Sequence, residues 1–171
     1  LKGCDFGSEE KFWEEYTKLF GWKNAAQWYK EKYLFSMIDV LKKNYSSRAN
    51  LADFFGKLKS AEKKIVIFSD YGMTKERMEA VGISKETQNL CDGIFSATDF
   101  GCLKPAVRPF KEIAEKIGVP CENCLVVGDR LDTDGKGAFL AGMKFIQIKT
   151  HKNDGVDWKK FAEKVLAQVE S

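Results

Sequence analysis

Three aspartates follow a short apolar run that ends in a glycine. The run is "LVVG" at residues 125–128, and the carboxylates belong to Asp129, Asp132 and Asp134. Like charges this close repel one another, so such a cluster usually persists because a cation occupies it. Carboxylate oxygens are hard ligands of the kind that Mg²⁺ prefers. The spacing therefore predicts a magnesium site at the end of a buried strand.

Polar side chains also follow two other apolar runs. Ser69 and Asp70 come directly after "IVIF", and Lys104 lies in the loop that follows "GIFS". Ligands of open α/β sheets bind at the carboxyl ends of the strands, so we expect these side chains to face the same crevice as the aspartates. A hydroxyl and an ammonium group beside a cation suit a phosphoryl group. Ser69, Asp70 and Lys104 are therefore candidate substrate-binding residues.

From Lys63 onward, strand-like and helix-like segments alternate. Strands are expected in "KKIVIFSD", "GIFS", "CLVVGD" and "KFIQI", and helices over 75–81, 109–117 and 135–141, with a final amphipathic helix that begins near Trp158. Alternation with short loops is typical of α/β proteins. The expected architecture is a Rossmann-like parallel sheet with helices on both faces.

The first sixty residues differ from the rest of the chain in aromatic content and in the spacing of apolar residues. Of the 22 aromatic residues, 13 lie within residues 1–55, and apolar side chains recur at helical spacing. One such stripe begins at Phe12, a second at Leu34 and a third at Leu51, while Ser8 before two glutamates is a plausible helix start. We therefore divide the chain into a helical cap region at 1–60 and an α/β core at 61–171.

Composition excludes several classes of function. The net charge of +3 comes from lysines scattered among acidic residues, which gives no basic stripe for nucleic acid. No apolar run reaches the length of a membrane span, and no signal peptide is visible. Five cysteines, an odd number, indicate reduced thiols and a cytoplasmic location. The expected partner is a small molecule, with neither nucleic acid nor membrane.

The order Ser, then Lys-Pro, then Gly-Asp-x-x-x-x-Asp resembles the haloacid dehalogenase-like superfamily of phosphohydrolases, over roughly residues 61–148. The resemblance implies that Ser69 binds the transferring phosphoryl group. It also implies that Lys104 neutralises the negative charge of the phosphoryl group and of the nucleophile. It implies that Asp129 and Asp134 hold Mg²⁺, directly or through its waters. Asp132 lies off this spacing and is expected either in a turn or in contact with the ligand residues rather than with the ion. The helical region resembles the cap that many members insert between their first and second motifs.

The first motif of that family, an Asp-x-Asp after an apolar strand, is absent from this sequence. Asp5 follows "LKGC", which is no buried strand, and position 7 is Gly, so the role of nucleophile is not transferred to Asp5. The family's first strand lies mid-sheet, between the strands that carry the second and fourth motifs. Without it, unpaired backbone groups would each cost on the order of 1–3 kcal/mol. We therefore expect an additional N-terminal segment to supply that strand.

The predicted function is a Mg²⁺-dependent phosphatase of small phosphorylated metabolites that works through an aspartyl-phosphate. A 2-haloacid dehalogenase is an alternative, but its chemistry needs no metal, so Asp129 with Asp134 counts against it. A phosphomutase is a further alternative. A catalytically inactive binding or regulatory module of the same fold is the alternative from another class. A response-regulator receiver is disfavoured because its Lys-Pro comes last, whereas here Lys-Pro precedes the Gly-Asp.

Overall fold

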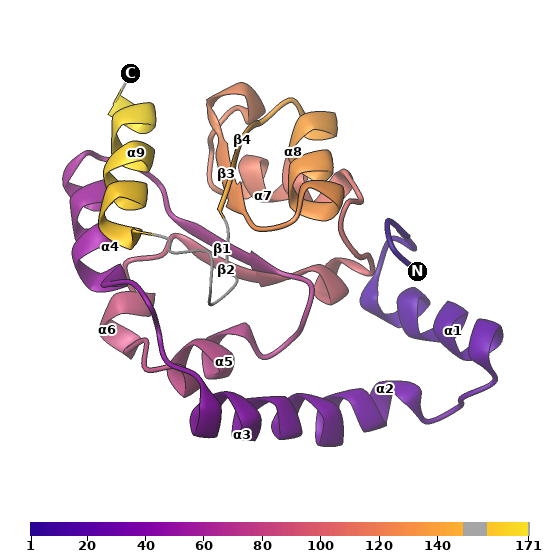
Figure 1. Cartoon of the computed structure of the whole chain (residues 1–171). Helices are drawn as coiled ribbons and strands as arrows, with labels where there is room; N and C mark the ends of the chain where they lie inside the picture. The colour runs from indigo at the N-terminus through magenta and orange to yellow at the C-terminus, as the bar shows by residue number, and fades with distance from the viewer. Residues whose placement is uncertain (149–156, 171) are drawn as a thin grey trace.

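The computed structural model describes residues 1–148 and 157–170, as a helical stretch followed by an alternation of strands and helices (Figure 1). The helical stretch comprises α1 (Glu9–Phe20), α2 (Ala25–Trp28), the π-helical turn η1 (Tyr29–Tyr33), α3 (Leu34–Asn44) and α4 (Leu51–Ser60). The alternating part comprises β1 (Val66–Ser69), α5 (Thr74–Ala80), α6 (Lys85–Gln88), β2 (Gly93–Ser96), η2 (Ala97–Phe100), α7 (Arg108–Lys116), η3 (Cys121–Asn123), β3 (Leu125–Gly128), η4 (Leu131–Gly135), α8 (Lys136–Ala141), β4 (Lys144–Gln147) and α9 (Trp158–Glu170).

The expected α/β fold class is confirmed. Every strand expected from the sequence is present, and the expected helices begin and end within a few residues of their predicted limits. The predicted start of α1 is also correct, because the Ser8 side chain accepts a hydrogen bond from the Lys11 N–H. The same helix ends at Gly21, whose φ of 66° is left-handed and suits a residue without a Cβ.

The strands form two parallel pairs. β1 pairs with β2 in a register that sets Val66 opposite Gly93, and β3 pairs with β4 in a register that sets Leu125 opposite Lys144. Within residues 1–148 and 157–170, no strand pairing joins β1 to β3, so the two pairs do not form one continuous sheet. We expect a further strand between the strand that ends at Ser69 and the strand that precedes Asp129. The separation of the two pairs is compatible with such a strand but does not test it.

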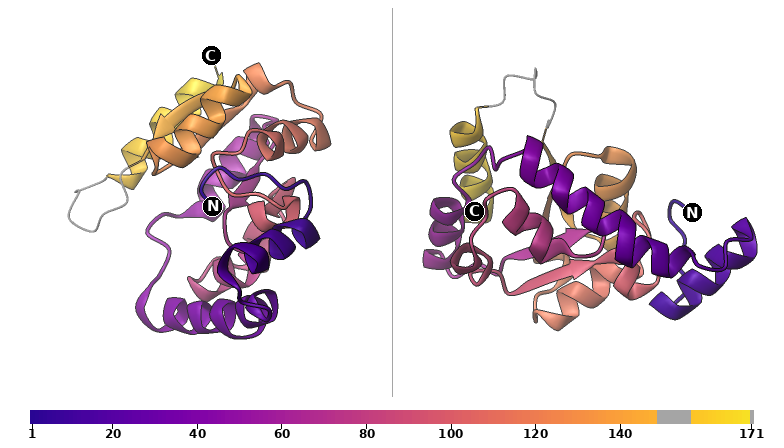
Figure 2. Two further views of the ribbon diagram at one scale, coloured as in Figure 1. Left: turned by 90° about the vertical axis from the view of Figure 1, so that its right-hand side faces the viewer. Right: turned by 90° about the horizontal axis from the view of Figure 1, so that it is seen from below.

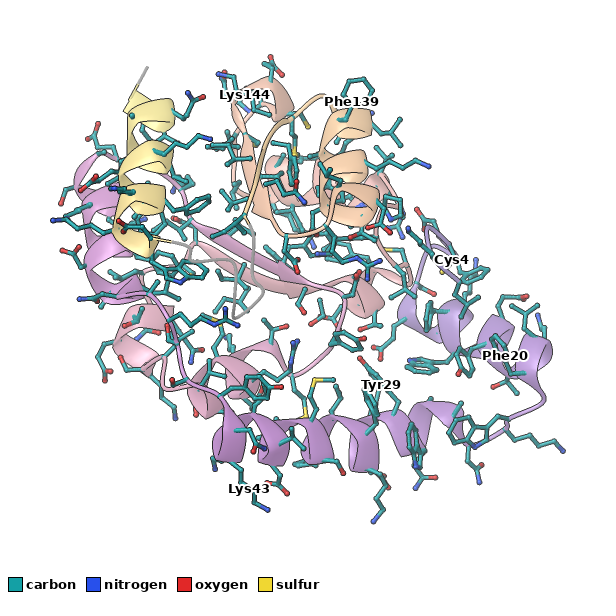
Figure 3. All side chains as sticks on the ribbon, viewed as in Figure 1. Cys4, Phe20, Tyr29, Lys43, Phe139 and Lys144 are labelled. Atoms are coloured by element: carbon teal, nitrogen blue, oxygen red, sulfur yellow. The ribbon has the colours of Figure 1, made fainter. Side chains whose placement is uncertain are left out.

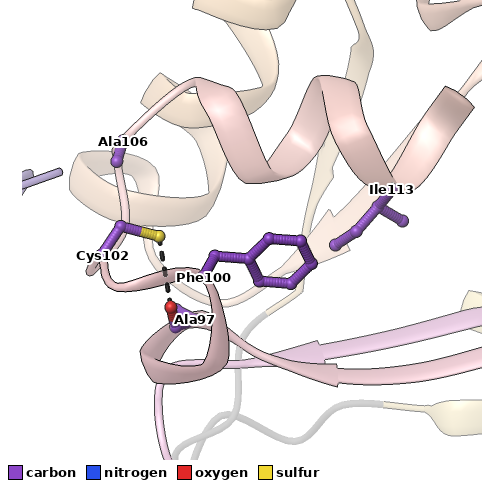
Figure 4. Packing of buried hydrophobic residues seen from close by; sticks show 5 residues of the cluster. All are labelled: Ala97, Phe100, Cys102, Ala106 and Ile113. Carbon is purple, nitrogen blue, oxygen red and sulfur yellow. Dashed lines mark hydrogen bonds between the residues drawn. The ribbon is translucent and has the colours of Figure 1, made fainter. Parts of the chain in front are cut away.

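A buried cluster supports the loop that carries Lys104. Figure 4 shows this cluster, in which Phe100, Cys102 and Ile113 pack with Ala97 and Ala106. Cys102 is fully buried, and its Sγ donates to the Ala97 carbonyl at 3.3 Å. Burial raises the pKa of the Cys102 thiol to about 12, so this sulfur stays protonated and packs as an apolar group. The cluster fixes the path of the chain into the candidate site.

The N-terminal residues run beside this same loop. Asp5 forms an isolated antiparallel bridge with Cys102, and the Phe6 N–H donates to the Gly101 carbonyl at 2.9 Å. Gly101 adopts a φ of 69°, and a Cβ built on it would lie 2.0 Å from the Ser8 carbonyl oxygen. Gly101 is therefore required both by its backbone conformation and by its contact with the start of α1.

Gly101→Ala is expected to lower the free energy of unfolding by roughly 2–4 kcal/mol, because it adds overpacking to left-handed strain. Urea denaturation measures this loss. Gly21→Ala is the matched control: its φ is 66°, but no atom lies within 4 Å of the added Cβ. The control should lose only about 1–2 kcal/mol, from backbone strain alone. Equal losses in the two variants would show that the Ser8 contact does not constrain position 101.

The helical stretch occupies two places in the molecule. In Figures 1 and 2, α2, η1 and α3 run along the side of the molecule opposite β3, β4 and α8. α4 packs near the start of β1: Phe55 and Leu58 form a buried cluster with Ile65, against which Leu166 of α9 packs. Residues 9–60, all of which are described, contain no strand. The division into a cap at 1–60 and a core at 61–171 remains a prediction: Ile67 of β1 packs against the cluster formed by α4, and α3 and α1 contact α5 and η2.

Asp92 ties the end of α4 to the start of β1. Its carboxylate accepts from the Ile65 N–H at 2.8 Å and from Lys59 and Lys64 at 3.0 and 3.2 Å. Burial alone would raise the pKa of Asp92, but these three donors outweigh it and hold the pKa at about 2. Because the folded pKa lies below the ordinary value of 3.8, Asp92 stabilises the fold above about pH 4, and this contribution is lost as pH falls toward 2.

Asp92→Asn should therefore flatten the acid side of the stability profile. Between pH 4 and pH 2, the free energy of unfolding of the unchanged protein should fall by roughly 1 kcal/mol more than that of the variant, since solvent screens the half-exposed lysines. Denaturant titrations across this pH range measure the difference. Parallel profiles for the two proteins would contradict the assignment.

Candidate active site

A lysine–aspartate ion pair lies at the centre of the candidate site. Lys104 Nζ is 2.6 Å from Asp134 Oδ1, and both side chains are only 11% exposed. Lys104 also donates to the Phe68 carbonyl at 3.4 Å, near the end of β1. The loop after β2 and the helical turn after β3 are therefore joined at the carboxyl ends of β1 and β3. A buried ion pair whose partners come from different loops fixes the separation of those loops.

Two further contacts fix the residues around this pair. The Lys104 N–H donates to Asp70 Oδ1 at 2.9 Å, so the residue after Ser69 holds the backbone of the Lys104 loop. The Arg130 N–H donates to Asp134 Oδ2 at 3.3 Å. A Cβ at Gly128 would lie 2.5 Å from the Asp134 carboxylate, so glycine at this position lets the carboxylate approach the end of β3. Asp70, Lys104 and Asp134 thus form one contiguous polar group.

Ser69 makes its side-chain contacts with the turn and helix that follow β1. Its Oγ accepts from the Tyr71 N–H at 3.2 Å and from Arg77 Nη1 at 2.9 Å. Arg77 also donates to the Tyr71 carbonyl at 3.3 Å, and its guanidinium lies 5.4 Å from the centre of the Tyr71 ring. Burial lowers the pKa of Arg77, which still leaves the guanidinium charged near neutral pH. Ser69 therefore has a fixed cation beside its hydroxyl.

Asp129 and Asp132 lie on the exposed side of the loop after β3. The Asp129 carbonyl accepts from Gln147 Nε2 at 3.0 Å, which links it to β4. The Asp132 carboxylate pairs with Arg130 at 2.9 Å and with Lys2, and hydrogen bonds from these two cations lower its pKa. These partners place Asp132 in a surface ion-pair group, whereas Asp134 of the same loop is buried.

Asp5 is engaged away from the Lys104–Asp134 pair. Arg108 Nη2 lies 2.7 Å and Arg108 Nε 3.0 Å from its two carboxylate oxygens, and the Gly7 N–H donates at 3.1 Å. The hydrogen bond from Arg108 lowers the pKa of Asp5. A carboxylate held by a guanidinium on both oxygens is a weak nucleophile, which agrees with leaving Asp5 out of the catalytic set.

The carboxylates after β3 fit a magnesium ion in number and chemistry. Mg²⁺ in phosphoryl-transfer sites is commonly held by one or two carboxylates and completed by waters and substrate phosphate oxygens. Asp129 and Asp134 would supply such a pair from one short loop. In the described part of the chain, no group of three or more His, Cys, Asp or Glu side chains surrounds a single point.

Arg77 is the site residue that the sequence did not reveal. Its position on α5 resembles that of many solvent-exposed helical arginines, and no motif marks it. The only signal was its position eight residues after Ser69, on the short helix that follows β1, in "SDYGMTKER". Its Nε is buried and makes no hydrogen bond within the described residues, although Nη1 does. Burial of part of a guanidinium beside a hydroxyl is a tertiary property that the local sequence does not encode.

Comparison with known proteins gives a family match for the second half of the chain. A family model described as "HAD-hyrolase-like" matches residues 101–170, which include Lys104, Asp129 and Asp134. A curated relative, the glyceraldehyde 3-phosphate phosphatase of Methanopyrus kandleri, is 43% identical over 54 residues. That alignment covers 32% of this chain and 23% of the relative, so it compares only a segment of each.

Solved structures share the fold over most of the chain. A HAD phosphatase from Thermococcus onnurineus superposes with a TM-score of 0.58 at 21% identity, covering 88% of this chain and 65% of that one. The β-phosphoglucomutase of Clostridium difficile superposes with a TM-score of 0.60 at 16% identity, covering 99% and 80%. This chain thus spans less than two thirds of the Thermococcus phosphatase. The family model confirms, over residues 101–170, the resemblance to the haloacid dehalogenase-like superfamily that the motifs predicted, and the solved structures show that the fold is shared.

Proposed function

We propose that this chain forms the phosphate- and magnesium-binding part of a Mg²⁺-dependent phosphatase that hydrolyses small phosphorylated metabolites through an aspartyl-phosphate. The observation that carries the proposal is the buried Lys104–Asp134 pair, 2.6 Å apart, next to Asp70 and the end of β1. A cation and a carboxylate held together at the carboxyl ends of parallel strands suit binding of an anion and of a metal side by side.

Ser69 would bind a phosphoryl oxygen with its hydroxyl proton. A serine hydroxyl has one donor and two acceptor positions, and here Arg77 and the Tyr71 N–H occupy the acceptor positions. The remaining O–H is therefore available to donate to a phosphoryl oxygen. The neighbouring Arg77 guanidinium would add positive charge on the same side.

Lys104 would neutralise negative charge on the phosphoryl group and on the attacking carboxylate. Its ammonium is held in place by Asp134 and the Phe68 carbonyl, so little reorganisation is needed when the substrate binds. Asp129 and Asp134 would hold Mg²⁺, which supplies charge neutralisation for the phosphate when bound. The proposal also requires a nucleophilic aspartate, a role that we assign to no residue of this chain.

The alternatives differ in the product that they release. Inorganic phosphate from a panel of phosphate monoesters would support the phosphatase, and chloride from a 2-chlorocarboxylic acid would support the dehalogenase. Conversion of one sugar phosphate into another without net phosphate release would support the phosphomutase. The assay uses the complete protein with added Mg²⁺. If none of the three products forms, the binding or regulatory module becomes the better account.

A small phosphorylated molecule remains the proposed partner, with neither nucleic acid nor membrane. Among the described residues, no helix is long and apolar enough to cross a bilayer. All five cysteines are free thiols. The cytoplasmic location inferred from these cysteines remains a prediction.

A further inference from the structure

A cavity of about 280 Å³ lies between α1, the α2–η1 segment and the loop after β1. We call it the aromatic cavity. Its lining includes Trp13 and Tyr16 of α1, Trp28 and Tyr29 of the next helical segment, and Tyr71 and Asp70 of the loop. Tyr29 lies on the helical segment that faces the core, on the side of the molecule away from α8 (Figure 3). The cavity is thus bounded by aromatic rings on the helical side and by a candidate site residue on the other.

The rings of the aromatic cavity contact one another. The Trp13 and Tyr29 ring centres are 5.1 Å apart, and Tyr29 stacks on Tyr33 at 5.7 Å with an angle of 18° between the rings. Tyr33 in turn lies 6.3 Å from Tyr71. Offset contacts of this kind are favourable and hold each ring in place. The wall of the cavity is therefore ordered before any ligand enters.

The aromatic cavity is directly coupled to the candidate phosphate site. Asp70, which lines it, accepts a hydrogen bond from the Lys104 N–H at 2.9 Å, and Leu103 lines it as well. Tyr29 Oη accepts from the Gly72 N–H at 3.0 Å, which ties the helical wall to the turn that follows Ser69. A molecule whose phosphate lies at Ser69 and Lys104 would therefore have its organic part beside the aromatic cavity.

Trp13 carries a buried polar atom without a partner. Its Nε1 is inaccessible to solvent and makes no hydrogen bond within the described residues. Buried indole N–H groups usually have an acceptor, so one left without a partner is unfavourable. Because solvent does not reach this atom, a ligand in the open cavity would not reach it either. The assignment of a ligand site therefore rests on the ordered rings and on their position beside Asp70.

We propose that the aromatic cavity binds the alcohol part of a phosphate monoester, and that this part is a flat, largely apolar ring. The proposal rests on the proposed phosphatase function and specifies its substrate class. A dry cavity of about 150 Å³ accepts benzene, so 280 Å³ accommodates one ring and its linker. Aromatic walls favour such a ring over a short polyhydroxylated chain, which would lose its hydrogen bonds to water there.

Binding of two matched phosphate esters to the complete protein tests the proposal. The esters are 2-phenylethyl phosphate and 2-hydroxyethyl phosphate, which carry the same charge on similar alkyl linkers. Trp13, Trp22 and Trp28, three of the four tryptophans, line the cavity, so indole fluorescence reports ligand entry without any need for turnover. We expect the phenyl ester to bind at least about tenfold more tightly, because burying a ring adds favourable apolar contact.

Two substitutions localise the effect. Trp13→Ala removes a wall of the cavity and should reduce the preference for the phenyl ester by about tenfold, whereas Trp13→Phe retains a ring and should preserve most of it. Phe139→Ala is the control, since Phe139 is 80% exposed on α8 at the other end of the molecule (Figure 3). This control should keep the full preference.

The outcomes separate this inference from the proposed function. Equal binding of the two esters, or a preference that survives Trp13→Ala, would overturn the aromatic-ring assignment even if phosphate is released from both. A preference that depends on Trp13, in a protein that hydrolyses no ester, would retain the binding assignment and refute the phosphatase.

Discussion

Lys104→Met is expected to abolish most of the activity and to destabilise the protein as well. Methionine keeps the length and apolar stem of lysine but removes the ammonium group that lies 2.6 Å from Asp134. The phosphoryl group would then lose a preorganised positive charge, a change that typically costs about 10²–10³-fold in rate. Steady-state phosphate release by the complete protein measures this loss.

The same substitution leaves the Asp134 carboxylate buried without its cation. Breaking a buried pair by removing one partner typically costs about 3–5 kcal/mol. Lys57→Met is the matched control, because Lys57 pairs with Asp53 at 2.8 Å on the surface, where both side chains are more than half exposed. The control should lose about 1 kcal/mol or less. If both variants unfold at the same urea concentration, the Lys104–Asp134 pair does not have the structural role assigned to it.

Asp129→Asn is expected to reduce phosphatase activity by about a hundredfold or more. Asparagine keeps the shape of the side chain and removes the charge that an ion would require. Metal catalysis of this kind is worth several kcal/mol, and about 1.4 kcal/mol corresponds to tenfold in rate. The fold should survive, because removing one charge from a crowded acidic loop relieves repulsion.

Asp132→Asn provides the control for this prediction. Asp132 lies three residues away in the same loop, is half exposed and pairs with Arg130 and Lys2 on the surface. Its replacement should change the rate by no more than a few-fold, since exposed pairs contribute little. Thermal denaturation of both variants shows whether they are folded. Equal activity losses at positions 129 and 132 would indicate a general effect of loop charge rather than a metal ligand.

The sequence predicted the elements of the core and the candidate residues at their ends. Strong local signals made this possible: β1 and β3 are short apolar runs followed at once by polar residues, and Ser8 caps α1 with its own side chain. The sequence predicted that residues 1–60 are helical, but no apolar stripe marked α2 and η1 as an element of their own. In this segment the Tyr29 ring contacts that of Trp13, and the Trp28 ring contacts that of Tyr33. Such ring contacts accompany its helical conformation, whereas no apolar period along the chain does.

Long-range contacts were the part that sequence patterns could not supply. Arg77 reaches Ser69 because α5 folds back over the end of β1, and α4 packs beside α9 although more than a hundred residues separate Phe55 from Leu166. The separation of β1–β2 from β3–β4 likewise depends on which strands pair, and strand composition does not determine that. Such contacts arise from tertiary packing, whereas sequence motifs indicate only the local conformation and the residue types at its ends.

The most direct test of the proposed function is phosphate release from a monoester by the complete protein, measured after removal of divalent cations and again after addition of Mg²⁺. We expect chelation to abolish release, Mg²⁺ to restore it, and Asp129→Asn to show little release in either condition. Release that continues unchanged in excess chelator would contradict the assignment of Asp129 and Asp134 as the residues that hold a required ion.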